Sequence, residues 1–210
     1  MPLRAAISLL ALLAAAAQGQ VVDRIVARIE MDVITLSEVR ELGAFQQLAG
    51  APRMDDAALL RQLIEQWIVA NDAAAARFGQ PSEARIDKDI AELEASFPSR
   101  QAYLARLGEL ALSERAVRRL MLRRVYLSHY LEYKFRPAVQ VDPADIERYY
   151  GEDFTRDLRA RKQPVPPLEE VSEQIRELLV EREISRRAAE WLEQTRAQIR
   201  VEFPEQETGK

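Results

Sequence analysis

Few residues of this chain are of the types that carry out ordinary enzyme chemistry. The 210-residue sequence contains no cysteine, which excludes disulfides, thiol nucleophiles and thiolate metal sites. His129 is the only histidine, and a lone histidine late in a helix is more often a surface or capping residue than a metal ligand. The nucleophile-elbow, P-loop and dinucleotide-binding motifs are absent from the sequence. We therefore expect no catalytic residue, no metal site and no cofactor.

Carboxylates one helical turn apart, such as Glu169 and Glu173, are the remaining candidates for acid–base chemistry. Arginines lie close to them in the sequence, at Arg176, Arg182 and Arg186. Charges of alternating sign at this spacing are typical of a solvated helix face, and this is the better interpretation.

Basic and aromatic side chains gather on one predicted helix over residues 114–135. Its arginines are Arg115, Arg118, Arg119, Arg123 and Arg124. A solvated face that pairs with acidic neighbours is the simplest interpretation, and an electrostatic patch for an acidic client is the alternative. The formal net charge of −4 argues against nucleic acid as the main partner, because phosphate binding needs a basic surface.

Tyr126, Tyr130, Tyr133 and Phe135 follow the arginines at helical spacing. Core packing is the default interpretation of such a stripe. Partly exposed tyrosines would instead suit the binding of extended peptides, because they combine apolar contact with a polar group at low entropy cost.

The elements that position these residues are predicted to be mostly helices. Thr35 to Glu38 form a capping box, and Asp55 or Asp56, Ser82, Ser99, Ser113 and Asp142 are further start signals. We expect helices over residues 36–48, 56–78, 83–97, 100–108, 114–135, 143–150 and 168–199. Alternating apolar residues predict a β-hairpin over residues 21–35 and a third strand over residues 199–203, which could join the two ends of the chain.

The last predicted helix, residues 168–199, organises the rest of the chain. It would be about 45 Å long at about 1.5 Å per residue, and it cannot bury its apolar stripe against itself. We therefore expect it to return to an earlier helical body, with Trp191 packed against the early helices.

Residues 1–19 have the pattern of a secretory signal peptide. Arg4 precedes an uncharged stretch, and small residues follow it, so that cleavage after Ala17 or after Gly19 fits the pattern. The apolar run is shorter than the ~20 residues of a transmembrane helix, although an uncleaved anchor is the alternative. We expect an exported, periplasmic protein with no stable membrane insertion after cleavage.

The order of several segments resembles the SurA-type periplasmic chaperones. Residues 21–29 followed by 33–39 resemble the opening of that family, and residues 59–67 look like its second helix. Residues 141–150 are similar to the segment before the family's first parvulin domain, and residues 167–179 to the segment after the parvulin part. The resemblance covers nearly the whole mature chain.

The sequence departs from that family where a parvulin prolyl-isomerase domain usually stands. Only residues 151–167, seventeen in all, separate the two flanking segments, whereas a domain needs at least ~50 residues. The histidines and glycines of a parvulin site are missing too. Isomerase activity is therefore not implied, and a prolyl isomerase is the least favoured alternative.

The resemblance implies a mainly α fold, a SurA N-terminal-like helical domain with a small β-hairpin, closed by a long C-terminal helix and a short strand. The expected divisions are signal peptide 1–19, chaperone body 20–151, connector 152–167, closing helix and strand 168–203, and tail 204–210. Its implied function is an ATP-independent holdase for unfolded or extended polypeptides such as outer-membrane protein precursors. A structural or assembly subunit, or a homodimer with a fixed envelope partner, is the alternative. The expected peptide-binding residues are Phe45, Leu48, Tyr103, Tyr126, Tyr130 and Tyr133.

Overall fold

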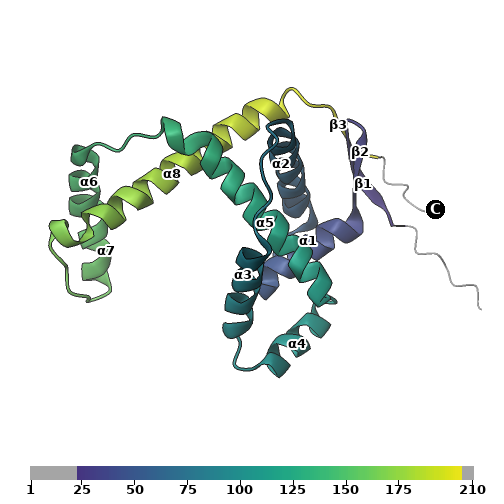
Figure 1. Ribbon diagram of the computed structural model, residues 1–210, viewed down its shortest axis with the longest axis horizontal. Coiled ribbons are helices and arrows are strands. Elements are labelled where there is room, and N and C mark those ends of the chain that lie inside the picture. Colours follow the sequence, from purple (N-terminus) through teal and green to yellow (C-terminus); the bar gives the residue numbers. More distant parts are fainter. Residues whose placement is uncertain (1–22, 205–210) are drawn as a thin grey trace, which may run out of the picture.

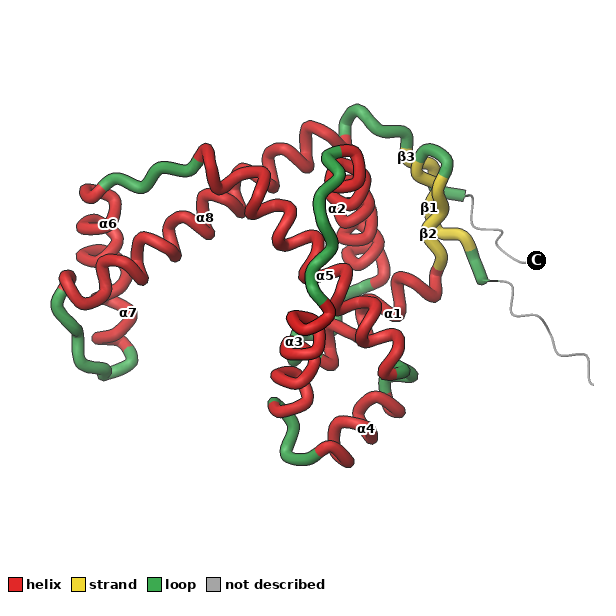
Figure 2. Tube along the Cα trace, viewed as in Figure 1, coloured by secondary structure: helices red, strands yellow, loops and turns green. Residues whose placement is uncertain are grey.

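The computed structural model describes residues 23–204, so the predicted signal peptide lies outside the described residues. The chain is mainly helical, with a small antiparallel sheet, as the sequence predicts (Figure 2). Its elements in order are β1 Ile25–Ile29, β2 Asp32–Thr35, α1 Leu36–Leu48, α2 Asp56–Ala75, α3 Glu83–Ala95, α4 Arg100–Glu109, α5 Glu114–Phe135, α6 Pro143–Tyr149, α7 Thr155–Ala160, α8 Leu168–Arg196 and β3 Val201–Glu202. Short 3₁₀ and π-helical turns occupy Arg136–Ala138 and Tyr150–Phe154.

Side chains cap α1 to α5 where the sequence predicts them, whereas Asp142 precedes α6 without a side-chain cap hydrogen bond. The Thr35 backbone N–H donates to Glu38 Oε2 at 2.8 Å, and the Glu38 N–H donates back to the Thr35 hydroxyl, which completes the capping box. Each of the caps of α2 to α5 accepts a hydrogen bond from the N–H three residues ahead, and these caps are Asp55, Ser82, Ser99 and Ser113. Local capping therefore fixes where these helices begin.

The sheet joins the two ends of the chain in the order β2-β1-β3. Ile29 of β1 lies opposite Asp32 of β2 on one side and Val201 of β3 on the other, and both pairings are antiparallel. The Glu30 N–H also donates to the Arg200 carbonyl at 3.2 Å. The predicted third strand is therefore confirmed.

The sheet, α1 to α5 and the end of α8 form what we call the body. One buried cluster lies between α1, α3, α4 and α5, and a second lies between the sheet, α1 and α2. Close packing of α1 on α2 requires Gly43, because a Cβ there would lie 2.7 Å from Leu59 Cδ1. Trp191 and Leu192 of α8 pack against this body, as the sequence predicts.

The other end of α8 belongs to a second packing unit, residues 141–179, which we call the outer lobe. Figure 1 shows α6 and α7 at the end of α8 that lies away from the sheet. Ile146, Val171 and Ile175 form its small buried cluster, and Tyr150 and Phe154 pack on it. The long helix thus buries one end against the body and the other against residues that follow α5.

The predicted connector, residues 152–167, is partly helical and contains α7. Its polar composition and its prolines favoured an irregular segment, but tertiary contacts order it. The Tyr150 hydroxyl donates to the Pro166 carbonyl at 2.9 Å, and the Thr155 hydroxyl donates to the Gly151 carbonyl at 3.0 Å. Across residues 23–204, every helix is too short or too polar to span a lipid bilayer.

Candidate functional site

Two hollows in the body lie beside α1 and α5, and we refer to them together as the groove. Its narrower part is a hollow of about 530 Å³ between α1, α2 and α5, which we call the small hollow. The residues that line it are Leu42, Phe45, Gln46, Ala49, Ala51, Met54, Gln62, Gln66, Leu120, Arg123, Arg124 and Leu127.

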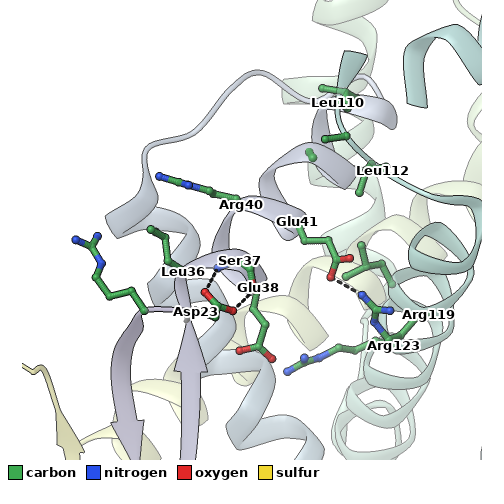
Figure 3. A pocket seen from close by; sticks show the side chains of 14 residues that line it. Asp23, Leu36, Ser37, Glu38, Arg40, Glu41, Leu110, Leu112, Arg119 and Arg123 are labelled. Carbon is green, nitrogen blue, oxygen red and sulfur yellow. Dashed lines mark hydrogen bonds and ion pairs between the residues drawn. The ribbon is translucent and has the colours of Figure 1, made fainter. Parts of the chain in front are cut away.

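The larger hollow, of about 940 Å³, is shown in Figure 3. The start of β1, the first turns of α1, the α4–α5 turn and α5 surround this large hollow. Leu120 and Arg123 line both hollows.

The small hollow has an apolar floor with amide groups beside it. Leu42, Phe45 and Leu127 are buried there. Gln46 Nε2 donates to Gln62 Oε1 at 2.6 Å across the gap between α1 and α2. Because amide side chains both donate and accept, they can bind a peptide backbone without selecting its sequence.

The charges along the groove are arranged unevenly. Arg119 pairs with Glu41 inside the large hollow. The lining of the small hollow contains Arg123 and Arg124 but no acidic residue. This part of the groove therefore favours a ligand that carries negative charge.

Arg123 is more buried than Arg124, the other arginine that lines the small hollow. It takes part in no hydrogen bond or ion pair within the described part of the chain, and burial lowers the pKa of its guanidinium, an effect that the nearby charge of Glu38 opposes. Figure 3 shows Arg119 reaching Glu41, whereas Arg123 extends toward the side of Glu38. The Glu38 carboxylate is already engaged by the Thr35 backbone and hydroxyl at 2.8 and 3.1 Å.

The structure divides the arginines of α5 between two roles. Arg118 pairs with Glu83 and Asp87, and Arg119 pairs with Glu41, in agreement with a solvated face. Arg123 and Arg124 instead line the groove. Sequence spacing could not separate the two groups, because their acidic partners come from α1 and α3.

The expected peptide-binding residues lie in different places. Phe45 forms part of the groove floor. Leu48 and Tyr103 are 3% and 1% exposed inside the cluster between α1, α3, α4 and α5, and Tyr130 is 3% exposed. Placing these three on a client-facing surface was wrong, since the same helical spacing that groups them also directs them into the core.

Tyr126, Tyr130 and Tyr133 gather around Phe78 rather than in the groove. Their ring centroids lie 5.7, 5.3 and 5.2 Å from that of Phe78. Tyr126 is half-buried and Tyr133 is 63% exposed, so these two remain accessible. They form an aromatic edge of the body that is separate from the groove lining.

A polar contact beside this aromatic edge links α2 to α5, and its lysine also reaches α8. Asp72 of α2 accepts hydrogen bonds from the Tyr130 hydroxyl at 2.6 Å and from Lys134 Nζ at 2.5 Å. Lys134 also lies 4.4 Å from the centre of the Trp191 ring. Burial acts to raise the pKa of Asp72, but the hydrogen bonds from Lys134 and Tyr130 outweigh it and lower that pKa.

Burial, together with the hydrogen bond to Asp72, raises the pKa of the Tyr130 hydroxyl, which therefore stays protonated as the donor. Among residues 23–204, no group of three or more His, Asp or Glu side chains is placed to hold a metal ion. Of the two carboxylates considered for acid–base chemistry, Glu173 pairs with Arg176 on the surface of α8.

Sequence reasoning missed the amide and thioether groups of the groove, which are Gln46, Gln62, Gln66 and Met54. No local pattern marks them, because they come together only when α1 and α2 pack. No protein-family model matches the chain, and no curated protein matches its sequence. The resemblance to the SurA-type chaperones therefore stays a prediction from the sequence.

Proposed function

We propose that this protein is an ATP-independent holdase that binds extended segments of unfolded polypeptides in the groove along α1 and α5. The observation that carries the proposal is the composition of the small hollow: an apolar floor, glutamine amides and two arginines. An apolar floor accepts side chains of many shapes, and amides bind the backbone that all clients share.

The segment order that resembles the SurA-type chaperones supports the same function. Together with the predicted signal peptide, it favours a periplasmic protein whose clients include outer-membrane protein precursors. Binding of each client segment is expected to be weak, about micromolar or ~−8 kcal/mol, because ordering the client offsets much of the contact energy.

The proposal is tested by filling the small hollow without disturbing the core. Ala51 is exposed and lines the hollow, whereas Ala57 is exposed at the start of α2 and lines neither hollow. The Ala51→Trp variant should need about tenfold more protein than wild type to suppress aggregation of a urea-unfolded outer-membrane protein on dilution, a loss of about 1.4 kcal/mol in binding. The matched Ala57→Trp variant should behave like wild type.

Light scattering after dilution measures the aggregation, and circular dichroism checks that both variants fold. The proposal fails if wild type does not suppress aggregation at all. It also fails if Ala51→Trp and Ala57→Trp suppress it equally well.

A fixed assembly partner or a homodimer is the second candidate, and apolar residues around the sheet favour it. Met31, Val33 and Phe203 are large, apolar and exposed beside β2 and β3, which form the two edges of the sheet. Edge strands with exposed apolar side chains readily pair with another chain. Stoichiometric co-purification with one protein, or a stable dimer in light scattering, together with no suppression of aggregation, would favour this candidate.

A further inference from the structure

β3 forms one edge of the sheet, and some of its backbone groups point away from the rest of the sheet. Val201 lies opposite Ile29, and the Glu30 N–H donates to the Arg200 carbonyl at 3.2 Å. Antiparallel pairs alternate between hydrogen-bonded and non-hydrogen-bonded positions, so the pair of Ile29 and Val201 is a non-hydrogen-bonded one. The N–H and C=O of Val201 are therefore directed away from β1, toward the open edge.

The side chains on either side of Val201 suit pairing with a second copy of the same strand. When two copies pair antiparallel across a two-fold axis at Val201, a residue on one side of the axis meets the residue equally far on the other side. Arg200 then faces Glu202 of the second copy, which is a pair of opposite charges. Ile199 faces Phe203 of the second copy, which is a pair of apolar side chains. Cross-strand pairs of both kinds stabilise a sheet.

The exposure of these side chains fits the same arrangement. The side chains of Arg200 and Glu202 are 79% and 51% exposed. Ile199 and Val201 pack against the cluster between the sheet, α1 and α2, but Phe203 is 57% exposed. Because side chains alternate between the two faces of a strand, Phe203 belongs to the same face as Val201, which is the face that packs on the body. A second copy would cover it with Ile199.

β2, the other edge of the sheet, does not offer this self-complementarity. The Thr35 N–H already donates to Glu38 in the capping box, which shortens the open edge. Antiparallel pairing of two copies about Val33 would place the buried Ile34 opposite Asp32, an apolar side chain against a charged one. β3 is therefore the edge that suits pairing with itself.

We propose that two copies of this chain pair through β3, antiparallel about Val201, and so join two three-stranded sheets into one sheet of six strands. Such a pair is closed by its two-fold axis and leaves neither β3 edge open. Figure 1 shows the sheet at the end of the molecule opposite the outer lobe, and residues 199–203 line neither hollow. The inference therefore goes beyond the holdase function and does not depend on it.

Sedimentation velocity over a series of concentrations up to about 200 µM tests the dimer in the full-length protein. Wild type should dimerise with a Kd of about 10 µM, since a short strand edge buries little surface. Arg200→Glu places Glu opposite Glu across the axis, and Glu202→Arg places Arg opposite Arg. Each variant alone should dimerise about tenfold more weakly, because like charges face each other twice in the dimer.

An equimolar mixture of Arg200→Glu and Glu202→Arg is the decisive sample. Every cross-strand pair of the mixed dimer again joins opposite charges, so a heterodimer should form about as tightly as the wild-type dimer. Neither chain regains the ion pair that Arg200 and Glu202 make within one copy. A change of stability within the single chain therefore cannot produce this recovery.

Two proline variants test the backbone part of the inference. Val201→Pro removes an N–H that faces the open edge and spares the hydrogen bonds to β1, so it should fold and dimerise at least about tenfold more weakly. Val33→Pro is the matched control at the other edge. Val33 lies opposite Arg28, whose own N–H and C=O face β3, so the Val33 N–H also points outward. This variant should dimerise like wild type, and circular dichroism checks the folding of each variant.

Three results would overturn the inference: a wild type that stays monomeric at about 200 µM, a mixture of the charge variants that forms no heterodimer, or equal dimerisation of Val201→Pro and Val33→Pro. Each of them leaves the holdase function standing as long as wild type suppresses aggregation. Val201→Pro should suppress aggregation like wild type, because it lies outside both hollows. A dimer that behaves as expected but suppresses no aggregation would overturn the holdase function alone.

Discussion

The body and the outer lobe share α8 but differ greatly in how much apolar surface each buries. Several clusters of buried side chains fill the body, and they involve the sheet and all of α1 to α5. In the outer lobe, Ile146, Val171 and Ile175 are the buried members of the cluster. Because a small core offsets little of the entropy lost on ordering a chain, the outer lobe should open locally well before the body unfolds.

The contacts that steady the outer lobe are also of a weaker kind. Arg136 pairs with Glu177 on the surface, and Arg182 lies 4.7 Å from the centre of the Tyr149 ring. Exposed ion pairs of this sort contribute ~0–1 kcal/mol each. Cation–π contacts at exposed sites contribute similarly little, ~0.5–1 kcal/mol. One helix, α8, is therefore expected to belong to two regions of very different stability.

The largest effect on stability is expected when a buried isoleucine is shortened to alanine in each of the two regions. Ile64 in the body is 0% exposed and Ile175 in the outer lobe is 1% exposed. Ile64→Ala should destabilise the whole chain by about 2–5 kcal/mol, because it leaves a cavity in a large cooperative core. Ile175→Ala should open residues 143–175 while the body keeps its stability. Hydrogen exchange followed by mass spectrometry, with thermal unfolding, distinguishes the two patterns.

The same two variants also test whether the body and the outer lobe unfold separately. If Ile175→Ala lowers the unfolding temperature and the protection of α1 and α2 as much as Ile64→Ala does, the two regions form one cooperative unit. Hydrogen exchange as slow in the wild-type outer lobe as in the body would lead to the same conclusion.

A smaller effect is expected at Asp72, which links α2 to α5. The folded-state pKa of Asp72 lies below its ordinary value of 3.8, so its carboxylate stabilises the fold above about pH 4 and loses this contribution as the pH falls through the folded pKa. The Asp72 side chain is 35% exposed, and solvent screening limits the effect to about 1 kcal/mol. Asp72→Asn should therefore lower the free energy of unfolding by about 1 kcal/mol near neutral pH.

Urea unfolding at neutral and acidic pH measures this dependence, and the difference between variant and wild type should shrink toward about pH 3. Asp56→Asn is a suitable control, since Asp56 is exposed in the first turn of α2. An Asp72→Asn variant with a destabilisation that does not change with pH would show that packing, not the charge of the carboxylate, stabilises the contact between α2 and α5.

The smallest effect is expected at the aromatic edge. Tyr133 is mostly exposed, so Tyr133→Ser should change the free energy of unfolding by less than about 0.5 kcal/mol. It should also leave aggregation suppression unchanged, because Tyr133 does not line the groove. The same light-scattering assay that is used for Ala51→Trp provides the measurement. If Tyr133→Ser lost as much aggregation suppression as Ala51→Trp, the tyrosines rather than the groove would be the client-binding surface.

Much of the fold could be predicted because the signals that set helix ends are local. The predicted helices over residues 36–48 and 114–135 match α1 and α5 at both ends. Less of the candidate site could be predicted. Phe45 was expected and lines the groove, whereas Gln62 and Met54 were not foreseen. The side chains of a groove between packed helices come from distant parts of the chain, and no spacing rule relates them.

The sequence by itself determined the helical class, the caps of α1 to α5 and the pairing of its two ends. Each of these depends on residue type or on neighbours within a few positions, apart from the end pairing, which an alternating pattern at both ends favours. Tertiary structure alone decided which tyrosines are buried, which arginines stay unpaired and that residues 155–160 form a helix. Burial and charge pairing depend on what lies opposite a side chain, and that is settled only when separate helices pack together.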